Sequence, residues 1–159
     1  MRVLMVEDSP DDARLLRQHL LEDRSDSEMF QVVDVDRLDV ALRRLDETGF
    51  EAVLLDLSLP DSHGIETLIT MHATKPGMPI VVLSSLDDEV LGLQLLQAGA
   101  QDYLVKAEVT ASLLRRSLRY AVERKRAEVE LRRSELFLES ILENIPDMIF
   151  VKDAERLAF

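Results

Sequence analysis

Short apolar runs alternate with longer amphipathic stretches through the first 105 residues of the chain. Each apolar run has the length of a β-strand, and the five runs are 2–6, 29–36, 51–56, 78–85 and 101–106. The intervening stretches repeat apolar residues at helical spacing, at 9–23, 38–49, 64–75 and 87–98. Strands joined by helical crossovers are parallel, and right-handed crossovers cover both faces of the sheet. The pattern therefore predicts a three-layer α/β domain.

Turn and cap residues mark the ends of several predicted elements. Ser9 is a suitable N-cap for the first helix, and Pro10 is a suitable first helical residue. Gly49 and Gly99 are suited to end the second and fourth helices. The runs "AVLL" and "IVVL" are continuously apolar, as expected of interior strands that are covered on both faces.

Polar residues follow four of the five predicted strands at the edge where parallel strands present their carboxyl ends. They are Glu7 and Asp8 after the first strand, Asp56 after the third, Ser84 after the fourth and Lys106 after the fifth. A single polar residue at a strand end ordinarily just faces solvent. Ligands, however, usually bind at this edge of a parallel α/β sheet, so the coincidence of all five residues predicts a shared pocket.

Three carboxylates in one pocket repel one another, and protonation or a cation relieves the repulsion. An all-oxygen site with few protein ligands suits Mg²⁺, which often lies beside a phosphate. A carboxylate can also attack a phosphoryl group to form an aspartyl phosphate, and Asp56 is the candidate nucleophile. Lys106 would supply a positive charge for the added oxygens, Ser84 a hydroxyl, and the loop after Asp56 its backbone N–H groups.

This set of residues resembles the receiver domain of two-component response regulators. The matching segments are the pair Glu7–Asp8, Asp56 in "LLDLSLPDSHG", Ser84 in "VLSS" and "GAQDYLVK" ending in Lys106. The step of 22 residues from Ser84 to Lys106 also fits the family, as does Tyr103 before the lysine. The resemblance implies a flavodoxin-like, doubly wound, five-stranded parallel sheet in the order 2-1-3-4-5 with a long C-terminal helix.

The resemblance also implies a role for individual residues. Asp56 would accept a phosphoryl group from a histidine kinase or a phosphotransfer protein, and Lys106 would pair with the phosphate. Ser84 would then move toward the phosphate, and Tyr103 would change rotamer to follow it. Such a protein would be a phosphoprotein of signal transduction and not an enzyme in its own right.

The cofactor that the resemblance implies is Mg²⁺. Asp8, Asp56 and the backbone carbonyl of Ser58 would bind the ion, and Glu7 would act through water. Two departures from the family pattern bear on the rest of the site. Ala107 stands where the family usually has a proline, so the bond after Lys106 is expected to be trans. Ser84 replaces the commoner threonine and keeps the hydroxyl.

Composition and charge narrow the class of protein. The chain has 159 residues, 47% of them hydrophobic, and no cysteine, so neither disulfides nor thiolate metal sites are available. Residues 1–105 hold 21 acidic and 8 basic residues, whereas residues 106–159 hold 10 and 11. An acidic first part disfavours nucleic acid as a partner. With neither a signal peptide nor a membrane span in the pattern, we expect a cytoplasmic protein.

From Thr110 the chain predicts one long helix, because neither glycine nor proline occurs before Pro146. Apolar and small residues alternate steps of four and three along it, which is the seam of a coiled coil: Tyr120, Ala127, Leu131, Leu138 and Ile141 are its central members. A second stripe of Val122, Val129 and Leu136 leaves the register open. We expect a parallel homodimer, with a solitary helix as the alternative.

The last residues suggest a further domain. The segment "LENIPDMIFVKD" resembles the opening of a PAS sensor domain, and the chain looks like a fragment of a larger protein. We therefore expect a receiver domain at 1–122, a coiled-coil linker helix at 123–143 and the truncated start of a PAS-like domain at 144–159. The missing part could be a histidine kinase or a diguanylate cyclase.

Three other functions are alternatives to a receiver. A Mg²⁺-dependent phosphohydrolase on the same fold generally needs a second acid two residues after the nucleophile, where this chain has Ser58. A flavin or nucleotide binder needs a glycine-rich phosphate loop, whereas the first loop here reads "EDSPDD". A dimerisation scaffold that is never phosphorylated remains compatible with the sequence.

Overall fold

The computed structural model describes residues 1–21, 29–47 and 49–144. By its contacts the chain divides into two units, residues 1–125 and residues 126–159, and each is described by itself. The part of the predicted PAS-like start that follows Asn144 lies outside the described residues. Among the described residues, no helix combines the length and the apolar character needed to cross a bilayer.

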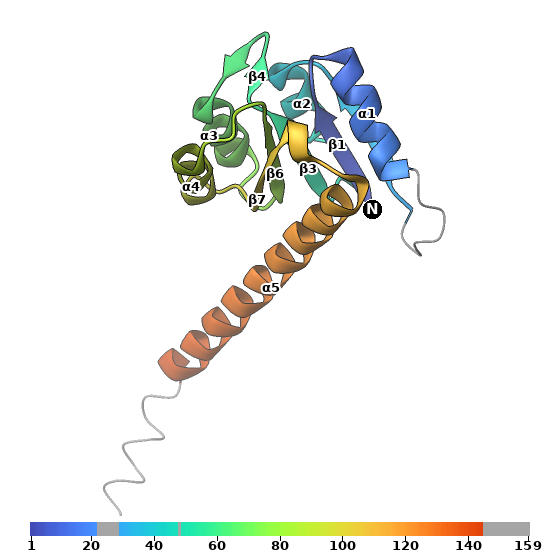
Figure 1. The fold of residues 1–159 in the computed structure, drawn as a ribbon. Helices are drawn as coiled ribbons and strands as arrows, with labels where there is room; N and C mark the ends of the chain where they lie inside the picture. Colours follow the sequence, from blue (N-terminus) through green and yellow to red (C-terminus); the bar gives the residue numbers. More distant parts are fainter. Residues whose placement is uncertain (22–28, 48, 145–159) are drawn as a thin grey trace, which may run out of the picture. The chain divides into compact units, whose positions relative to one another are not determined.

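Five parallel strands form the sheet of the first unit (Figure 1). They are β1 (Arg2–Val6), β2 (Gln31–Val35), β3 (Ala52–Asp56), β6 (Ile80–Ser84) and β7 (Asp102–Val105). Their order across the sheet is β2-β1-β3-β6-β7. This confirms the predicted order 2-1-3-4-5, because β6 and β7 are the fourth and fifth strands of the sheet.

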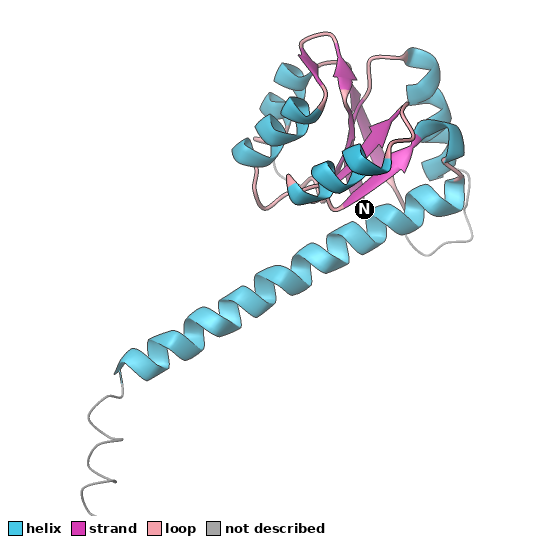
Figure 2. Ribbon diagram, turned by 60° about the vertical axis from the view of Figure 1, so that its left-hand side comes forward, coloured by secondary structure: helices cyan, strands magenta, loops and turns pink. Residues whose placement is uncertain are grey.

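Helices cover both faces of the sheet (Figures 1 and 2). On one face lie α2 (Leu38–Arg44), α3 (Ile65–Thr74) and α4 (Glu89–Gln97), whose buried leucines pack on alternate strand residues. On the other face lie α1 (Pro10–Leu21) and the beginning of α5 (Ala111–Asn144). Every residue of β3 and β6 is buried, as the continuous apolar runs predicted. The three-layer prediction is therefore confirmed.

Three local predictions were wrong or incomplete. The second helix ends at Arg44 and not at Gly49. The N–H groups of Asp46 and Glu47 donate to carbonyls three residues earlier, which forms tight turns in place of further helix. The loop after Asp56 contains a small antiparallel hairpin of β4 (Ser58–Leu59) and β5 (Ser62–His63). A 3₁₀ turn, η1 (Lys106–Glu108), follows β7.

Helix α5 differs in character along its length. In the first unit Leu114, Leu118, Ala121 and Val122 are buried in the core beside the sheet. In the second unit the residues from Arg126 to Glu143 are all exposed. Val122 therefore belongs to the core of the first unit, which shortens the second apolar stripe to Val129 and Leu136 on the exposed part.

Candidate functional site

The register of the sheet brings the predicted site residues to one edge. Val6 pairs with Leu55, so Glu7 and Asp8 follow beside Asp56. Asp56 pairs in turn with Leu83, the residue before Ser84, across the β3–β6 ladder. On the next ladder Ser84 is the register partner of Val105, the residue before Lys106. The strand ends are thus aligned to within about one residue, and the predicted pocket is assembled by backbone pairing.

Glu7, Asp8 and Asp56 form an acidic triad. A carboxylate oxygen from each lies within 4.8 Å of those of the other two. Glu7 and Asp56 are buried, each with 3% of its surface exposed, whereas Asp8 is exposed. Oxygen ligands at this spacing and partial access to solvent suit a hydrated Mg²⁺ ion, so the residues present fit the cofactor. The triad is typical of the receiver Mg²⁺ site.

Lys106 lies over the two buried acids. Its Nζ is 2.7 Å from Glu7 Oε2 and 2.9 Å from Asp56 Oδ2. The peptide bond after Lys106 is trans, as the absence of proline predicted. The departure at Ala107 therefore does not keep the ammonium from reaching Asp56.

Burial and charge act in opposite directions on this pair. Burial raises the pKa of Glu7 to about 7, although the hydrogen bond from Lys106 lowers it, and the Asp56 carboxylate raises it further. Burial would lower the pKa of Lys106, but hydrogen bonds to its carboxylate partners hold that pKa well above its usual range. The lysine is therefore charged at neutral pH, whereas the pKa of Glu7 lies close to neutral pH.

The loop after Asp56 supplies a backbone donor and ties the site to α2. The N–H of Ser58 donates to Asp56 Oδ1 at 3.2 Å. In the same loop the Asp61 carboxylate accepts from the N–H groups of Leu38 and Asp39 at 3.0 and 2.9 Å, capping α2. Asp61 was not singled out from the sequence, because its partners lie in a different segment of the chain.

Ser84 and Tyr103 both contact the backbone of Leu86. Ser84 Oγ accepts from the N–H of Leu86 at 3.1 Å, and the Tyr103 hydroxyl donates to the carbonyl of the same residue. The Tyr103 ring lies against α4 at Gly92, where a Cβ would come within 2.9 Å of a ring carbon. The predicted switch pair is thus linked through Leu86, a connection that sequence spacing alone could not reveal.

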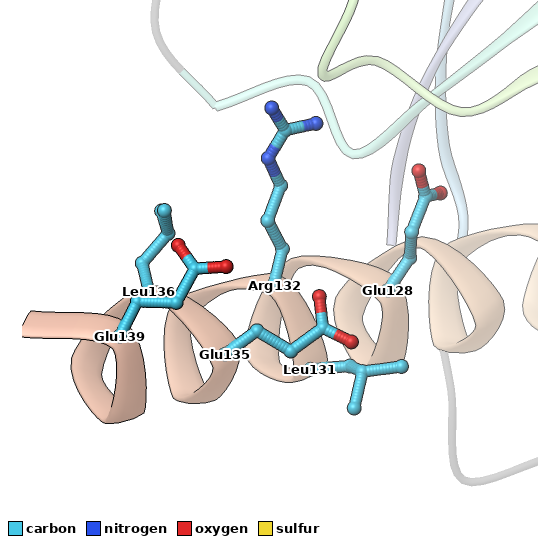
Figure 3. Close-up of a pocket in the computed structure, with 6 residues that line it drawn as sticks. All are labelled: Glu128, Leu131, Arg132, Glu135, Leu136 and Glu139. Atoms are coloured by element: carbon cyan, nitrogen blue, oxygen red, sulfur yellow. The ribbon is translucent and has the colours of Figure 1, made fainter. Parts of the chain in front are cut away.

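A shallow groove also lies on the second unit (Figure 3). All of its lining residues come from α5: Glu128, Leu131, Arg132, Glu135, Leu136 and Glu139. The lining thus consists of two leucines, three glutamates and one arginine. A groove on a single exposed helix encloses no reaction centre.

The fold and the site together define a receiver-type α/β domain: parallel strands that end in an acidic triad with a lysine above it. Residues 3–119 match the response regulator receiver domain family, and the chain belongs to this family. Receiver domains take phosphoryl groups from histidine kinases and are typically phosphoacceptors rather than catalysts.

Similarity to individual proteins agrees with this assignment. The chain is 33% identical over 155 residues to the transcriptional regulatory protein KdpE of Mycobacterium tuberculosis, covering 98% of this chain and 66% of KdpE. It is 37% identical over 118 residues to the transcriptional regulatory protein PrrA of Mycobacterium leprae, covering 72% of this chain and 47% of PrrA. The chain therefore spans less than two thirds of these relatives.

Among solved structures, the chain resembles the signal receiver domain of a LuxO repressor protein from Vibrio parahaemolyticus. The TM-score is 0.69 with 26% sequence identity, over 82% of this chain and 95% of that one. This similarity supports the CheY-like arrangement of the sheet and helices.

Proposed function

We propose that Asp56 is the phosphoacceptor of a two-component phosphorelay, supplied by a histidine kinase or a phosphotransfer protein. The observation that carries the proposal is the ammonium of Lys106, 2.9 Å from Asp56 Oδ2 at the mouth of the acidic triad. A carboxylate can attack a phosphoryl group to give an acyl phosphate. The Lys106 ammonium would then pair with the oxygens of the phosphoryl group.

Mg²⁺ is the proposed cofactor of this reaction. Asp8, Asp56 and the Ser58 backbone carbonyl would bind it, and Glu7 would act through water. When bound, the ion would offset the charge on the reacting phosphoryl group. The residues of the chain itself hold Asp56 in place: Ser58 donates an N–H to one carboxylate oxygen, and Lys106 contacts the other.

The signal would pass from the site to the face formed by α4 and β7. Phosphorylation would draw the Ser84 hydroxyl toward the new oxygens and away from the N–H of Leu86. Because the Tyr103 hydroxyl donates to the carbonyl of the same residue, a shift of the Leu86 backbone would alter the hydrogen bond that holds the ring. A population shift between two such arrangements is the proposed switch.

The output would lie downstream of α5, in a PAS-like or other module after Asn144. We propose that α5 carries the change there within a parallel homodimer. Support for this comes from the exposed apolar residues Leu131, Leu138 and Ile141, which are 63, 56 and 36% exposed in the second unit, with Ala127 on the same stripe. Tyr120, the seam residue in the first unit, is 54% exposed. A cytoplasmic location is proposed from the family.

Labelling with acetyl phosphate tests the central assignment. We expect Mg²⁺-dependent incorporation of one phosphoryl group per chain, with the hydroxylamine sensitivity of an acyl phosphate. Asp56→Asn should abolish the labelling, because an amide is not a nucleophile of this kind. Asp61→Asn is a matched control: it makes the same change in the same loop and keeps an oxygen that can cap α2.

Other outcomes separate the alternatives. Full labelling of Asp56→Asn would refute the assignment of the phosphoacceptor. Steady release of phosphate from a phosphatase substrate would favour a phosphohydrolase. A folded wild-type protein that accepts no phosphoryl group, from acetyl phosphate or from histidine kinases, would favour the unphosphorylated scaffold.

A further inference from the structure

Asp12 contacts the functional lysine from another part of the fold. It lies in the first turn of α1, and its Oδ2 atom is 3.0 Å from Lys106 Nζ, across 94 residues of sequence. The Lys106 side chain is 15% exposed and that of Asp12 is 44% exposed. The contact therefore sits at the rim of the site, where α1 and η1 border a small cleft.

The ammonium of a lysine has three N–H donors. Around Lys106 the structure places three carboxylates, those of Glu7, Asp56 and Asp12, at 2.7, 2.9 and 3.0 Å. Asp56 and Asp12 accept hydrogen bonds from the ammonium, and Glu7 is a close ion-pair partner. Two hydrogen bonds to carboxylates on different elements fix the direction of the ammonium as well as its charge, and Asp12 accepts one of them.

Asp12 differs from the other two carboxylate partners of Lys106 because it does not belong to the candidate metal site. Glu7 and Asp56 belong to the acidic triad that fits Mg²⁺, whereas Asp12 does not. Oxygen lone pairs that bind a cation are less available to an ammonium. With Mg²⁺ bound to the triad, Asp12 would therefore be the carboxylate partner of Lys106 that is not shared with the metal site.

The segment that carries Asp12 is firmly held. Ser9 Oγ accepts from the N–H of Asp12 at 3.4 Å, and the carbonyl of Ser9 accepts from the N–H of Ala13 at 2.9 Å. The N–H of Ser9 donates to Glu7 Oε1 at 3.1 Å, and Pro10 fixes the first helical φ. Hydrogen bonds of 2.9 to 3.4 Å thus connect the helix start to the acidic triad.

Lys106 itself opens the 3₁₀ turn η1, where its carbonyl accepts from the N–H of Val109 at 3.4 Å, and a trans bond joins it to Ala107. We propose that Asp12 is a positioning residue, which holds the Lys106 ammonium over Asp56 from α1. This inference rests on the proposed function, in which Lys106 pairs with a phosphoryl group on Asp56.

Three variants test the proposal. Asp12→Ala removes both the acceptor and the charge, while Asp12→Asn keeps an acceptor oxygen without the charge. Asp11→Asn is the matched control, because Asp11 is the neighbouring acid of the same helical turn and makes none of the Lys106 contacts above. Asp12→Asn also serves as the test variant should Asp12→Ala fail to fold.

The first readout uses metal-free protein and needs no phosphorylation. The sequence has four lysines, so the ¹⁵N-ammonium signal of Lys106 can be assigned by comparison with Lys106→Arg. We expect proton exchange at this ammonium to be about tenfold faster in Asp12→Ala, because a charge-assisted hydrogen bond is lost. Asp12→Asn should fall between, and Asp11→Asn should match wild type.

The second readout is the rate of labelling by acetyl phosphate. Asp12→Ala should be labelled about fivefold to tenfold more slowly than Asp11→Asn, because a less ordered ammonium stabilises the transition state less well. The affinity for Mg²⁺ should fall no further in Asp12→Ala than in Asp11→Asn, since both lose one nearby charge.

The proposal is overturned if Asp12→Ala, or Asp12→Asn in its place, equals Asp11→Asn in both ammonium exchange and labelling rate. Failure of the proposed function has a different signature. In that case wild type itself takes no label, while the ammonium measurement still reports whether Asp12 holds Lys106.

Discussion

The negative charge of Glu7 is costly to maintain inside the acidic triad. Its side chain is fully enclosed, and burial raises its pKa to about 7. Lys106 and the N–H of Ser9 offset part of this cost, whereas the nearby Asp56 adds to it. In the metal-free protein Glu7 is thus the carboxyl that changes protonation state near neutral pH.

This titration predicts a pH dependence of stability. An acid whose pKa rises on folding stabilises the folded state while it is protonated, so the Glu7 contribution is full below about 4.5 and is lost as the pH rises through about 7. Relative to Glu7→Gln, the metal-free wild-type protein should lose unfolding free energy over this window. Urea denaturation at a series of pH values measures the difference.

Glu66→Gln is the control for that experiment, because Glu66 is an exposed glutamate on α3. Its free energy of unfolding should follow that of wild type at every pH. A difference between wild type and Glu7→Gln that stays constant from pH 4.5 to pH 7.5 would contradict the raised pKa of Glu7.

At the scale of residues, the sequence predicted what position along a strand can reveal. Asp56 and Lys106 each follow an apolar run, and parallel strands present such ends at one edge. Asp12 gave no such signal, because acids in the first turn of a helix are common for local reasons. Its contact with Lys106 depends on where α1 lies against η1, which is set by packing and not by pattern.

Among the elements, α5 carries the most testable electrostatic pattern. If Leu131 and Leu138 occupy the a positions of a parallel coiled coil, Glu130 is at g and Glu135 at e. In a parallel homodimer each g residue faces the e residue five positions on in the partner helix. Glu130 would then face the partner's Glu135 on both sides of the interface, and like charges weaken such a dimer.

Reversing one charge should therefore strengthen the dimer. Glu130→Lys turns both repulsive pairs into attractive ones. We therefore expect the dissociation constant of the dimer to be about fivefold lower than in wild type. The double change Glu130→Lys with Glu135→Lys should return the dimer to roughly wild-type affinity. Sedimentation equilibrium on the full chain measures both.

Glu139→Lys is the control for this pair, because Glu139 lies off the a–d seam and should not face the partner seam in this register. Equal affinity of wild type and Glu130→Lys would rule out the parallel register. A dimer weakened by Glu130→Lys would indicate a different pairing of the helices.

The predicted elements were correct in kind and less accurate in extent. Strands β3 and β6 follow their apolar runs closely, because burial on both faces leaves no room for another periodicity. The β4–β5 hairpin was missed, since each strand has only two residues and no alternating pattern can be read from two. Helix α2 ends before Gly49 because tight backbone turns at Asp46 and Glu47 replace its helical hydrogen bonds.

For the molecule as a whole, the acidic triad makes stability depend on divalent cations. A ligand that binds only the folded state stabilises it by about 1.4 kcal/mol at a concentration tenfold above its Kd. For a domain of this size we expect Mg²⁺ at that level to raise Tm by about 3 to 6 °C. Asp56→Asn should lose most of this increase, because one ligand and one charge of the triad are gone.

Thermal unfolding with Mg²⁺, and with NaCl at matched ionic strength, measures the effect. The salt control is required because the chain carries a net charge of −12, and screening alone reduces its self-repulsion. A Tm increase that is equal in Asp56→Asn and wild type would place the bound ion elsewhere on the acidic surface.

The contact of both Ser84 and Tyr103 with Leu86 suggests an optical probe of the site. The chain has no tryptophan and two tyrosines, so its near-ultraviolet emission comes from Tyr103 and Tyr120. Tyr103 donates its hydroxyl to the Leu86 carbonyl, whereas Tyr120 is 54% exposed on α5. In a Tyr120→Phe variant, Tyr103 would be the single remaining fluorophore. It contacts Leu86, the residue whose N–H donates to Ser84. The fluorescence intensity of Tyr103 would then report, without an added label, which arrangement the loop after β6 has adopted.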